Sequence, residues 1–252
     1  MATWELLYNQ VVPKPVHYIS SIVSYLDILG FQKLVETKTA GELSQTLRVL
    51  AESTKPDKVF QSEGIEFTKF SDTVIRSVPE GQDCVRRLLS ELRSILYAQM
   101  ALIPRGIAIR GAVTVGKIVQ SWGIVYGPAV VRAYLLESKK GQPPRIVIDP
   151  EVVSLMERAV EAEGLQSEWD ALVQTEETTT YLDYLRACEM ELNVPEQEYP
   201  IFVLHHRDLI RDGLKKYSGT PAVLSKYEWM RNYHERTLQR RFANEVPSHL
   251  RV

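Results

Sequence analysis

Two acidic residues stand where runs of strand-forming residues end, a position from which carboxylates can hold a divalent cation. Asp27 closes the run YISSIVSYLD (18–27), and Asp72 lies in a turn inside GIEFTKFSDTVIRSV (64–78). Two carboxylates that converge repel each other unless a cation lies between them. Mg²⁺ prefers carboxylate oxygens together with substrate phosphates, so the pair predicts metal-dependent phosphate chemistry. Taken singly, Asp72 is better explained as a turn residue and Asp27 as a helix cap.

A second motif resembles a phosphate-binding loop and is rejected. The run from Gly111 to Lys117, GAVTVGK, matches the first seven positions of a P-loop, but the eighth position is Ile118 instead of Ser or Thr. The β-branched residues between the glycines favour a strand, whereas a phosphate loop needs a flexible backbone and a helix after it. We therefore expect Gly111 and Gly116 to permit a bulge or a close backbone approach.

The histidines and the C-terminal arginines are weaker candidates. Residues 199–205 are predicted as a strand, so the neighbouring His205 and His206 would point to opposite faces and could not chelate one ion. A basic helix is predicted around 227–242, and we expect its arginines to form a solvated face, with a contact to a partner or to nucleotide phosphates as the alternative. These arginines are Arg236, Arg240 and Arg241.

The elements that must position these residues follow from periodicity and turn residues. In chain order they are a strand at 18–27, helix at 32–53 with a division near 37–41, two short strands in 64–78, a helix at 82–101, β-rich residues at 107–120, a turn at Trp122-Gly123, a helix after Pro128, a strand at 145–149 and a helix from Pro150. On helix 82–101 the apolar face excludes Arg86, Arg87, Glu91 and Arg93. This order predicts an α/β (α+β) architecture, a sheet with helices on one face.

The domain organisation and the composition narrow the class of protein. Residues 1–150 are expected to form the core, and 151–252, which contain a polar stretch and no linker, an extension packed on the same domain. The net charge of −2 argues against binding nucleic acid or membrane by bulk charge. No apolar run approaches the roughly 20 residues of a membrane span, and no secretory signal is evident. Cys84 and Cys188 fit no zinc spacing, so a cytoplasmic protein is expected.

Four segments, spanning about residues 18–140, resemble the motifs of class III nucleotide cyclases. They are YLDILGF (25–31), KFSDTV (69–74), RGAVTVG (110–116) and GPAVVRAYLLES (127–138), and they occur in the order that family requires. The resemblance implies a ferredoxin-like cyclase sheet with helices packed on it and a C-terminal elaboration. It also implies a head-to-tail homodimer with active sites at the interface.

Carried over residue by residue, the resemblance assigns Asp27 and Asp72 as ligands of two Mg²⁺ or Mn²⁺ ions, together with the carbonyl of Ile28. The backbone near Gly30 and Phe31 would face the metals and the triphosphate. The implied reaction is attack by the 3′-hydroxyl of a nucleoside triphosphate on its own α-phosphate, with pyrophosphate leaving.

The chain departs from the family at several positions. The transition-state Asn and Arg positions fall on Val131 and Leu135, which cannot donate hydrogen bonds. Arg110 and Arg132 are nearby cations that could replace the missing charge, and salt bridges at a dimer interface explain them equally well.

The base-reading positions also differ. The adenine-selecting Lys falls on Thr68 and its partner Asp on Ile124, while Ser71 replaces the Gly of the family turn. We expect Thr68 and Ser71 to contact substrate with Gly30 and Phe31. The chain is then either a degenerate cyclase or one that cyclises another base.

The pattern F-S-D-[ST] with G-P-A-x-V-x-A-Y-x-L-E is similar to the pyrimidine cyclases of bacterial Pycsar anti-phage systems. That resemblance implies cyclic UMP, less readily cyclic CMP, as an alarm messenger read by a separate effector protein. The alternatives are a purine cyclase and a catalytically inactive module that binds a nucleotide. A polymerase-palm-like domain is less favoured because the chain is near neutral and shows no basic groove.

Overall fold

The computed structural model describes residues 16–56, 64–81, 83–121, 123–140, 143–243 and 245–252. Its centre is an eight-stranded mixed sheet with the order β2-β3-β1-β4-β6-β8-β7, and β5 pairs with β4 off this path. Only β4 and β6 are parallel among the described strand pairs. The strands are β1 (Ile19–Ile28), β2 (Glu66–Phe70), β3 (Thr73–Pro79), β4 (Ile109–Ser121), β5 (Ile124–Tyr126), β6 (Ile146–Ile148), β7 (Val173–Glu176) and β8 (Thr179–Leu182).

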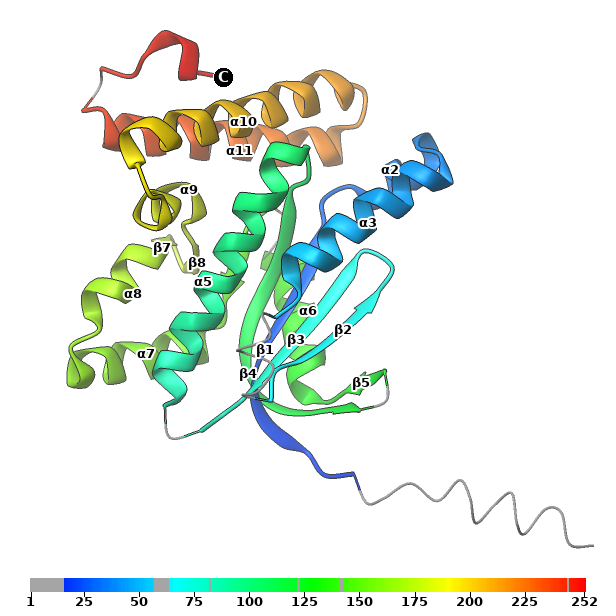
Figure 1. The fold of residues 1–252 in the computed structure, drawn as a ribbon, viewed down its shortest axis with the longest axis vertical. Coiled ribbons are helices and arrows are strands. Elements are labelled where there is room, and N and C mark those ends of the chain that lie inside the picture. The colour runs from blue at the N-terminus through cyan, green and yellow to red at the C-terminus, as the bar shows by residue number, and fades with distance from the viewer. Residues whose placement is uncertain (1–15, 57–63, 82, 122, 141–142, 244) are drawn as a thin grey trace, which may run out of the picture.

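Helices account for most of the remaining described chain (Figure 1). They are α2 (Phe31–Thr37), α3 (Ala40–Thr54), α5 (Cys84–Leu102), α6 (Pro128–Lys140), α7 (Pro150–Glu163), α8 (Gln166–Leu172), α9 (Tyr184–Ala187), α10 (Pro195–Lys216) and α11 (Pro221–Arg241), with short 3-10 turns at Ile103–Arg105, Cys188–Glu191 and Ser248–Leu250. The division between α2 and α3 follows from a capping box, in which Thr39 and Glu42 bond each other's backbone N–H groups. No helix among the described residues has both the length and the apolar character required to cross a bilayer.

Successive side chains of β1 point alternately to the two faces of the sheet. Ile22 and Leu26 point into the main core beneath α5, whereas Val23 belongs to a smaller cluster with Ala129 of α6. The α+β class predicted from the sequence is therefore confirmed. The expectation that helices cover one face only is wrong, because α6 packs against β1 and β4 on the other face. That face is thinly covered, and we call it the open face.

The segment from Gly111 to Lys117 lies within the continuous strand β4, so the P-loop is correctly rejected. A Cβ atom at Gly111 would lie 2.1 Å from the carbonyl oxygen of Tyr25, which confirms a close backbone approach. The short hairpin partner β5 follows, and Trp122 of the predicted turn lies outside the described residues.

Two expectations from the sequence, the strand at 199–205 and the solvent-facing Glu91, are wrong. Residues 199–205 are helical, because the buried positions of α10 recur every three or four residues: Tyr199, Phe202, Val203, His206, Leu209 and Ile210. Glu91 of α5 is buried, because Arg76 of β3 pairs with it in two hydrogen bonds. Of the C-terminal arginines, Arg240 and Arg241 are exposed, as expected of a solvated face, and Arg236 is partly buried. All three also bond polar side chains of the same chain. Arg236 pairs with Glu176, Arg240 with Gln174 and Arg241 with Glu189.

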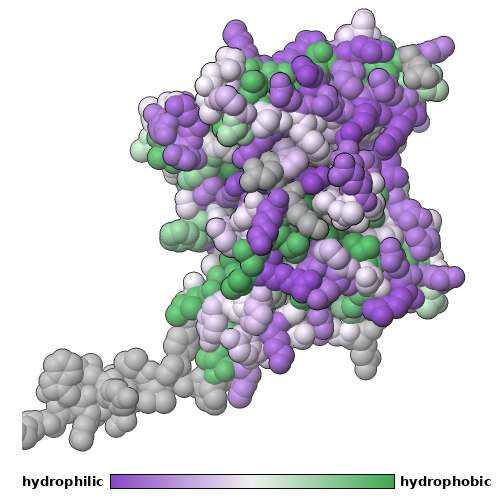
Figure 2. All heavy atoms as spheres, turned by 180° about the vertical axis from the view of Figure 1, so that it is seen from behind, coloured by the Kyte–Doolittle hydropathy of each residue, from purple (hydrophilic) through white to green (hydrophobic). Residues whose placement is uncertain are grey.

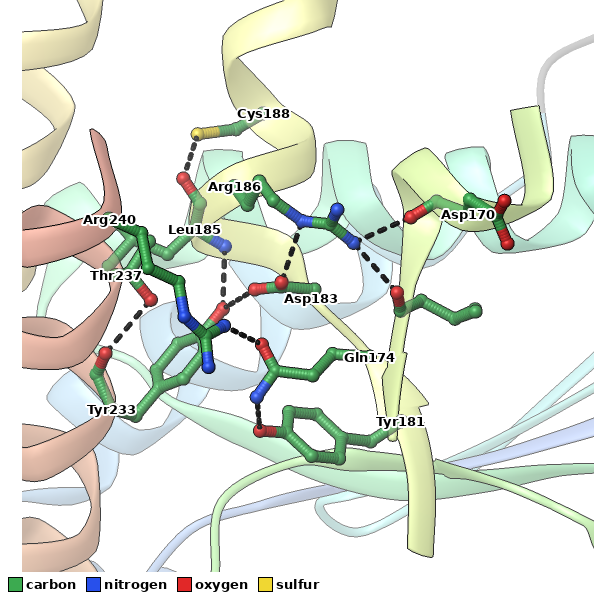
Figure 3. A network of polar contacts seen from close by, with 11 residues as sticks. Asp170, Gln174, Tyr181, Asp183, Leu185, Arg186, Cys188, Tyr233, Thr237 and Arg240 are labelled. Carbon is green, nitrogen blue, oxygen red and sulfur yellow. Dashed lines mark hydrogen bonds and ion pairs between the residues drawn. The ribbon is translucent and has the colours of Figure 1, made fainter. Parts of the chain in front are cut away.

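Residues after 150 extend the same sheet and then lie against one of its ends. Strands β7 and β8 add to β6, and α10 and α11 run side by side at the end of α5 (Figure 1). A polar network anchors α11 to this extension (Figure 3). The Tyr233 hydroxyl donates to the buried Asp183 carboxylate at 2.7 Å and accepts from the Leu185 N–H at 2.9 Å. Arg240 of the same helix donates to Gln174 of β7.

Candidate active site

The two acids at strand ends lie together. Asp27 is the penultimate residue of β1, and Asp72 lies in the tight turn between β2 and β3. Because β3 pairs with β1 through Leu26 and Val74, this turn is carried to the side of Asp27. The two carboxyl groups lie close enough for each to affect the other's protonation, and both line one cavity of about 580 Å³. The antiparallel pairing of β1 with β3 therefore brings together two acids that, taken singly, would not indicate a metal site.

The electrostatics of this acid pair favour a cation. Burial, then the hydrogen bond and the charge of Asp27, raise the pKa of Asp72 to about 7, against the lowering effect of its own backbone N–H and of the Ser71 hydroxyl. A carboxyl pair in this state competes for one proton when no cation is bound. No third His, Cys, Asp or Glu joins it among the residues described here. Two carboxylates with an adjacent main-chain carbonyl fit Mg²⁺ or Mn²⁺, which complete their shells with water and phosphate oxygens.

Arg110 supplies a cation in the same cavity. It lies directly opposite Asp27 in the pairing of β1 with β4, and its Nη2 is 2.9 Å from Asp27 Oδ2. Its Nε is 2.9 Å from Oε1 of the buried Glu137 on α6, as an ion pair without hydrogen-bond geometry. The guanidinium is thereby held against the acid pair, within reach of an anion in the cavity.

The β1–α2 connection and the β2–β3 turn complete the wall nearest to the acids. Ile28, Gly30 and Phe31 all line the cavity. Gly30 has φ 71° and Ser71 has φ 55°, both in the left-handed region that glycine adopts without strain. Ser71 therefore holds a strained backbone at the position where the resembled family carries a glycine, and its hydroxyl lowers the pKa of Asp72.

Two residues expected at the site lie elsewhere in the single chain. Thr68 of β2 accepts a hydrogen bond from Gln120 Nε2 at 2.8 Å and does not line the cavity. Arg132 of α6 bonds the buried Asp149 in a bidentate pair and Glu151 at 2.6 Å. That arrangement ties α6 to the start of α7, so in one chain Arg132 has a structural role.

The open face of the sheet carries a group of exposed apolar side chains around α6, which Figure 2 shows from behind. Val131 is 58% exposed and Leu135 43%, and both line a groove with Tyr18 and Arg132. Tyr18 contacts Tyr126 of β5 edge to face, with ring centroids 6.2 Å apart. The apolar open face is defined here by Tyr18, Ile124, Tyr126, Val131, Tyr134 and Leu135.

The fold of this chain is similar to solved structures of nucleotide cyclases. No family model matches the chain, and no curated protein matches it. The adenylyl cyclase CyaB from P. aeruginosa is 17% identical over 67% of this chain and 94% of that one, with a TM-score of 0.48. The catalytic core of a rhodopsin-guanylyl cyclase with converted specificity, in complex with ATPalphaS, is 18% identical over 65% and 94%, with a TM-score of 0.47. An adenylate/guanylate cyclase/hydrolase from Silicibacter pomeroyi is 18% identical over 66% and 96%, with a TM-score of 0.45.

Sequence reasoning missed the contribution of the C-terminal extension to the cavity. Thr220, Val223 and Lys226 from the start of α11 line it together with Asp27 and Asp72. No local motif marks these residues, since only the packing of α11 against the end of the sheet brings them there. Besides the ion pair of Lys33 with Glu36, the cavity thus combines the two converging carboxylates with the cations Arg110 and Lys226. This set suits a metal-bound polyphosphate.

Proposed function

We propose that this chain is a metal-dependent nucleotide cyclase that converts UTP, and less readily CTP, to the 3′,5′-cyclic nucleotide and pyrophosphate. The observation that carries the proposal is the convergence of Asp27 and Asp72 in one cavity beside Arg110. In the reaction the 3′-oxygen forms a bond to the α-phosphorus, the bond from that phosphorus to the bridging oxygen breaks, and the hydroxyl proton passes to solvent.

The residues divide this work between binding and charge stabilisation. Asp27, Asp72 and the Ile28 carbonyl would hold two Mg²⁺ or Mn²⁺ ions. Such ions lower the pKa of the hydroxyl and offset charge on the departing pyrophosphate. Arg110 contacts the phosphates, while its ion pair with Asp27 orients that carboxylate for binding. Gly30 and Phe31 place the β1–α2 backbone along the triphosphate.

Pyrimidine selectivity is supported by the residues at the base-reading positions. Thr68 and Ile124 stand where the resembled family carries the adenine-selecting lysine and its partner aspartate. A threonine hydroxyl, bonded to Gln120, and an exposed isoleucine cannot reproduce that charged pair. We propose that a bound base extends beyond the cavity lining of the single chain to reach Thr68, and that Ser71 shapes the turn that holds Asp72 against the substrate.

A head-to-tail homodimer is the proposed assembly. The acid pair lies on the same sheet face as Val23 and Tyr25, since residues 23, 25 and 27 alternate to one side of β1. That face also carries the exposed apolar side chains of α6, and large exposed apolar patches mark association surfaces. A second copy would cover both the patch and the mouth of the cavity.

The biological role proposed is an alarm signal in anti-phage defence, with the cyclic nucleotide read by a separate effector. Support for this role comes from the FSDT and GPAVVRAYLLE segments (70–73 and 127–137) quoted above. A messenger that ordinary metabolism does not produce suits such a system.

Incubation of the purified chain with ATP, GTP, CTP or UTP plus Mn²⁺, with products identified by chromatography and mass spectrometry, tests the activity. Cyclic UMP is the expected main product, and Asp27→Asn should abolish it. Conversion of ATP or GTP alone would replace the pyrimidine assignment with a purine cyclase. Tight nucleotide binding without turnover would indicate an inactive nucleotide-binding module.

A further inference from the structure

The start of α11 presents one face to the cavity. Thr220 occupies the N-cap position of the helix, and Thr220, Val223 and Lys226 recur at intervals of three residues, which places them on one side of it. All three line the cavity that contains Asp27 and Asp72. A segment more than 140 residues beyond the second acid, by the printed numbering, thus closes part of the same site.

Lys226 differs from the other cations of the cavity in its partners. Lys33 is paired with Glu36 at 2.7 Å, and Arg110 with Asp27 at 2.9 Å. Within the described part of the chain, Lys226 has no hydrogen bond and no ion pair, although its side chain is half-buried. A half-buried ammonium without a close anion is costly, so this side chain is arranged for an anion that enters the cavity.

The charged groups that act on Lys226 belong to the candidate active site or lie next to it. Burial, then the positive charge of Arg110, lower its pKa, while Glu137 and Asp27 raise it. The two cations therefore repel each other mildly across a shared space. A polyphosphate placed between them relieves that repulsion and gains charge-assisted hydrogen bonds.

The backbone that carries Lys226 is fixed. The neighbouring Tyr227 stacks on Tyr217, with ring centroids 5.6 Å apart and an interplanar angle of 14°. A Cβ atom at Gly213 would lie 2.1 Å from the Tyr227 ring, so α10 and α11 meet only because that position is glycine. Further along α11, Tyr233 is bonded to Asp183, as Figure 3 shows.

We propose that Lys226 binds phosphate oxygens of the triphosphate, so that the C-terminal extension supplies a cation to the active site of its own chain. The inference rests on the proposed function for the identity of the substrate as a triphosphate.

Inorganic tripolyphosphate with Mn²⁺ is the probe, because it tests the phosphate site without a base. Isothermal titration calorimetry on the full chain should give a dissociation constant about tenfold higher for Lys226→Met, equivalent to about 1.4 kcal/mol. Lys226→Arg should stay within about threefold of wild type. Lys215→Met, at an exposed lysine of α10 that does not line the cavity, should leave the constant unchanged.

A second measurement needs no variant. Acetylation of lysines in the wild-type chain, followed by mass spectrometry, should be slowed by tripolyphosphate at Lys226 and unchanged at Lys215. Wild-type affinity in Lys226→Met, or absence of protection, would overturn the inference while leaving cyclisation of a nucleotide intact. Protection with no turnover of any triphosphate would leave the inference standing and remove the proposed function. A wild-type chain that binds no tripolyphosphate overturns the inference directly.

Discussion

Arg110 Nη2 lies 2.9 Å from Asp27 Oδ2, and the two residues face each other across the β1–β4 pairing of one chain. Asp72 reaches the same cavity from the turn after β2. Both acids and the first cation of the candidate site therefore come from a single protomer. In the proposed dimer, a second protomer would contribute from its open face, where Val131 and Arg132 lie.

This arrangement predicts which inactive variants complement each other in a mixed dimer. Asp27→Asn mixed with Arg110→Met should stay inactive, because every site in the heterodimer keeps one lesion. Asp27→Asn mixed with Arg132→Met should recover about a quarter of wild-type activity if Arg132→Met alone is inactive, since half of the dimers are mixed and each has one intact site. Cyclase activity of equimolar refolded mixtures is the measurement. Recovery in the first mixture would contradict the placement of Arg110 beside Asp27 of its own chain.

Asp72→Asn should separate stability from function. The substitution removes one of two adjacent carboxylates, so the metal-free protein should unfold at a temperature a few degrees higher. Without the second carboxylate, Mn²⁺ should no longer raise the unfolding temperature, and turnover should be lost. Differential scanning calorimetry with and without Mn²⁺ checks both effects. Ser71→Gly, which relieves the left-handed backbone next to it, is the control that retains the Mn²⁺ response.

The apolar open face predicts the oligomeric state. Val131→Asp introduces a charge into that face and should convert a dimer to a monomer with little cyclase activity, while the unfolding temperature of the chain changes little. Ile201→Asp is a matched control, because Ile201 is 55% exposed, close to the 58% of Val131, and lies on α10. Light scattering after size exclusion gives the mass. A monomeric wild type with full activity would contradict the shared site.

The Arg76–Glu91 pair between β3 and α5 predicts a large loss of stability. The two side chains are 2% and 1% exposed and form two hydrogen bonds at 2.9 and 2.8 Å. Arg76→Met leaves Glu91 charged and buried, which should lower the free energy of unfolding by about 3–5 kcal/mol. Combining it with Glu91→Leu should cost less than Arg76→Met alone, because no buried charge then remains. Urea denaturation followed by circular dichroism measures both values, and additive losses would contradict this account.

The sequence is informative where a local pattern decides the structure. Turn residues mark the strand ends that carry Asp27 and Asp72, but the pairing of the two acids was implied by the resemblance of four motifs to class III cyclases and not by either strand end alone. The sequence predicts a strand in place of α10 because Tyr199–His205 is rich in aromatic and branched residues. The helical burial pattern of this segment becomes clear only once the elements that pack against it are known.

Contacts between distant segments could not be predicted in this way. Glu91 looks like a surface residue of α5 until Arg76 is placed against it. Lys226 carries no motif, and it reaches the cavity only because Gly213 allows α10 and α11 to pack closely. The fold class therefore follows from sequence patterns, whereas the part of the site contributed by the C-terminal extension depends on tertiary packing.

The buried pair His206 and His234 predicts how stability depends on pH. Their Nδ1 atoms are 2.9 Å apart, Tyr184 lies 2.7 Å from His206 Nε2, and His234 Nε2 lies 2.8 Å from the Leu250 carbonyl oxygen. Since that carbonyl only accepts, His234 Nε2 carries a proton and its Nδ1 accepts from His206 Nδ1–H. With the Tyr184 hydroxyl donating to His206 Nε2, every bond in the chain is made while both rings are neutral.

Burial, and for His206 also the charge of the other ring, lower both pKa values below the ordinary 6.5. The unfolded chain binds more protons below that value, so stability is complete above about pH 6.5 and falls as the solution becomes more acidic. Between about pH 7.5 and about pH 5, the free energy of unfolding should fall by about 2 kcal/mol more in wild type than in His206→Gln, which cannot titrate. Urea denaturation across this range measures the difference, and parallel pH profiles would show that His206 is not held neutral in the folded state.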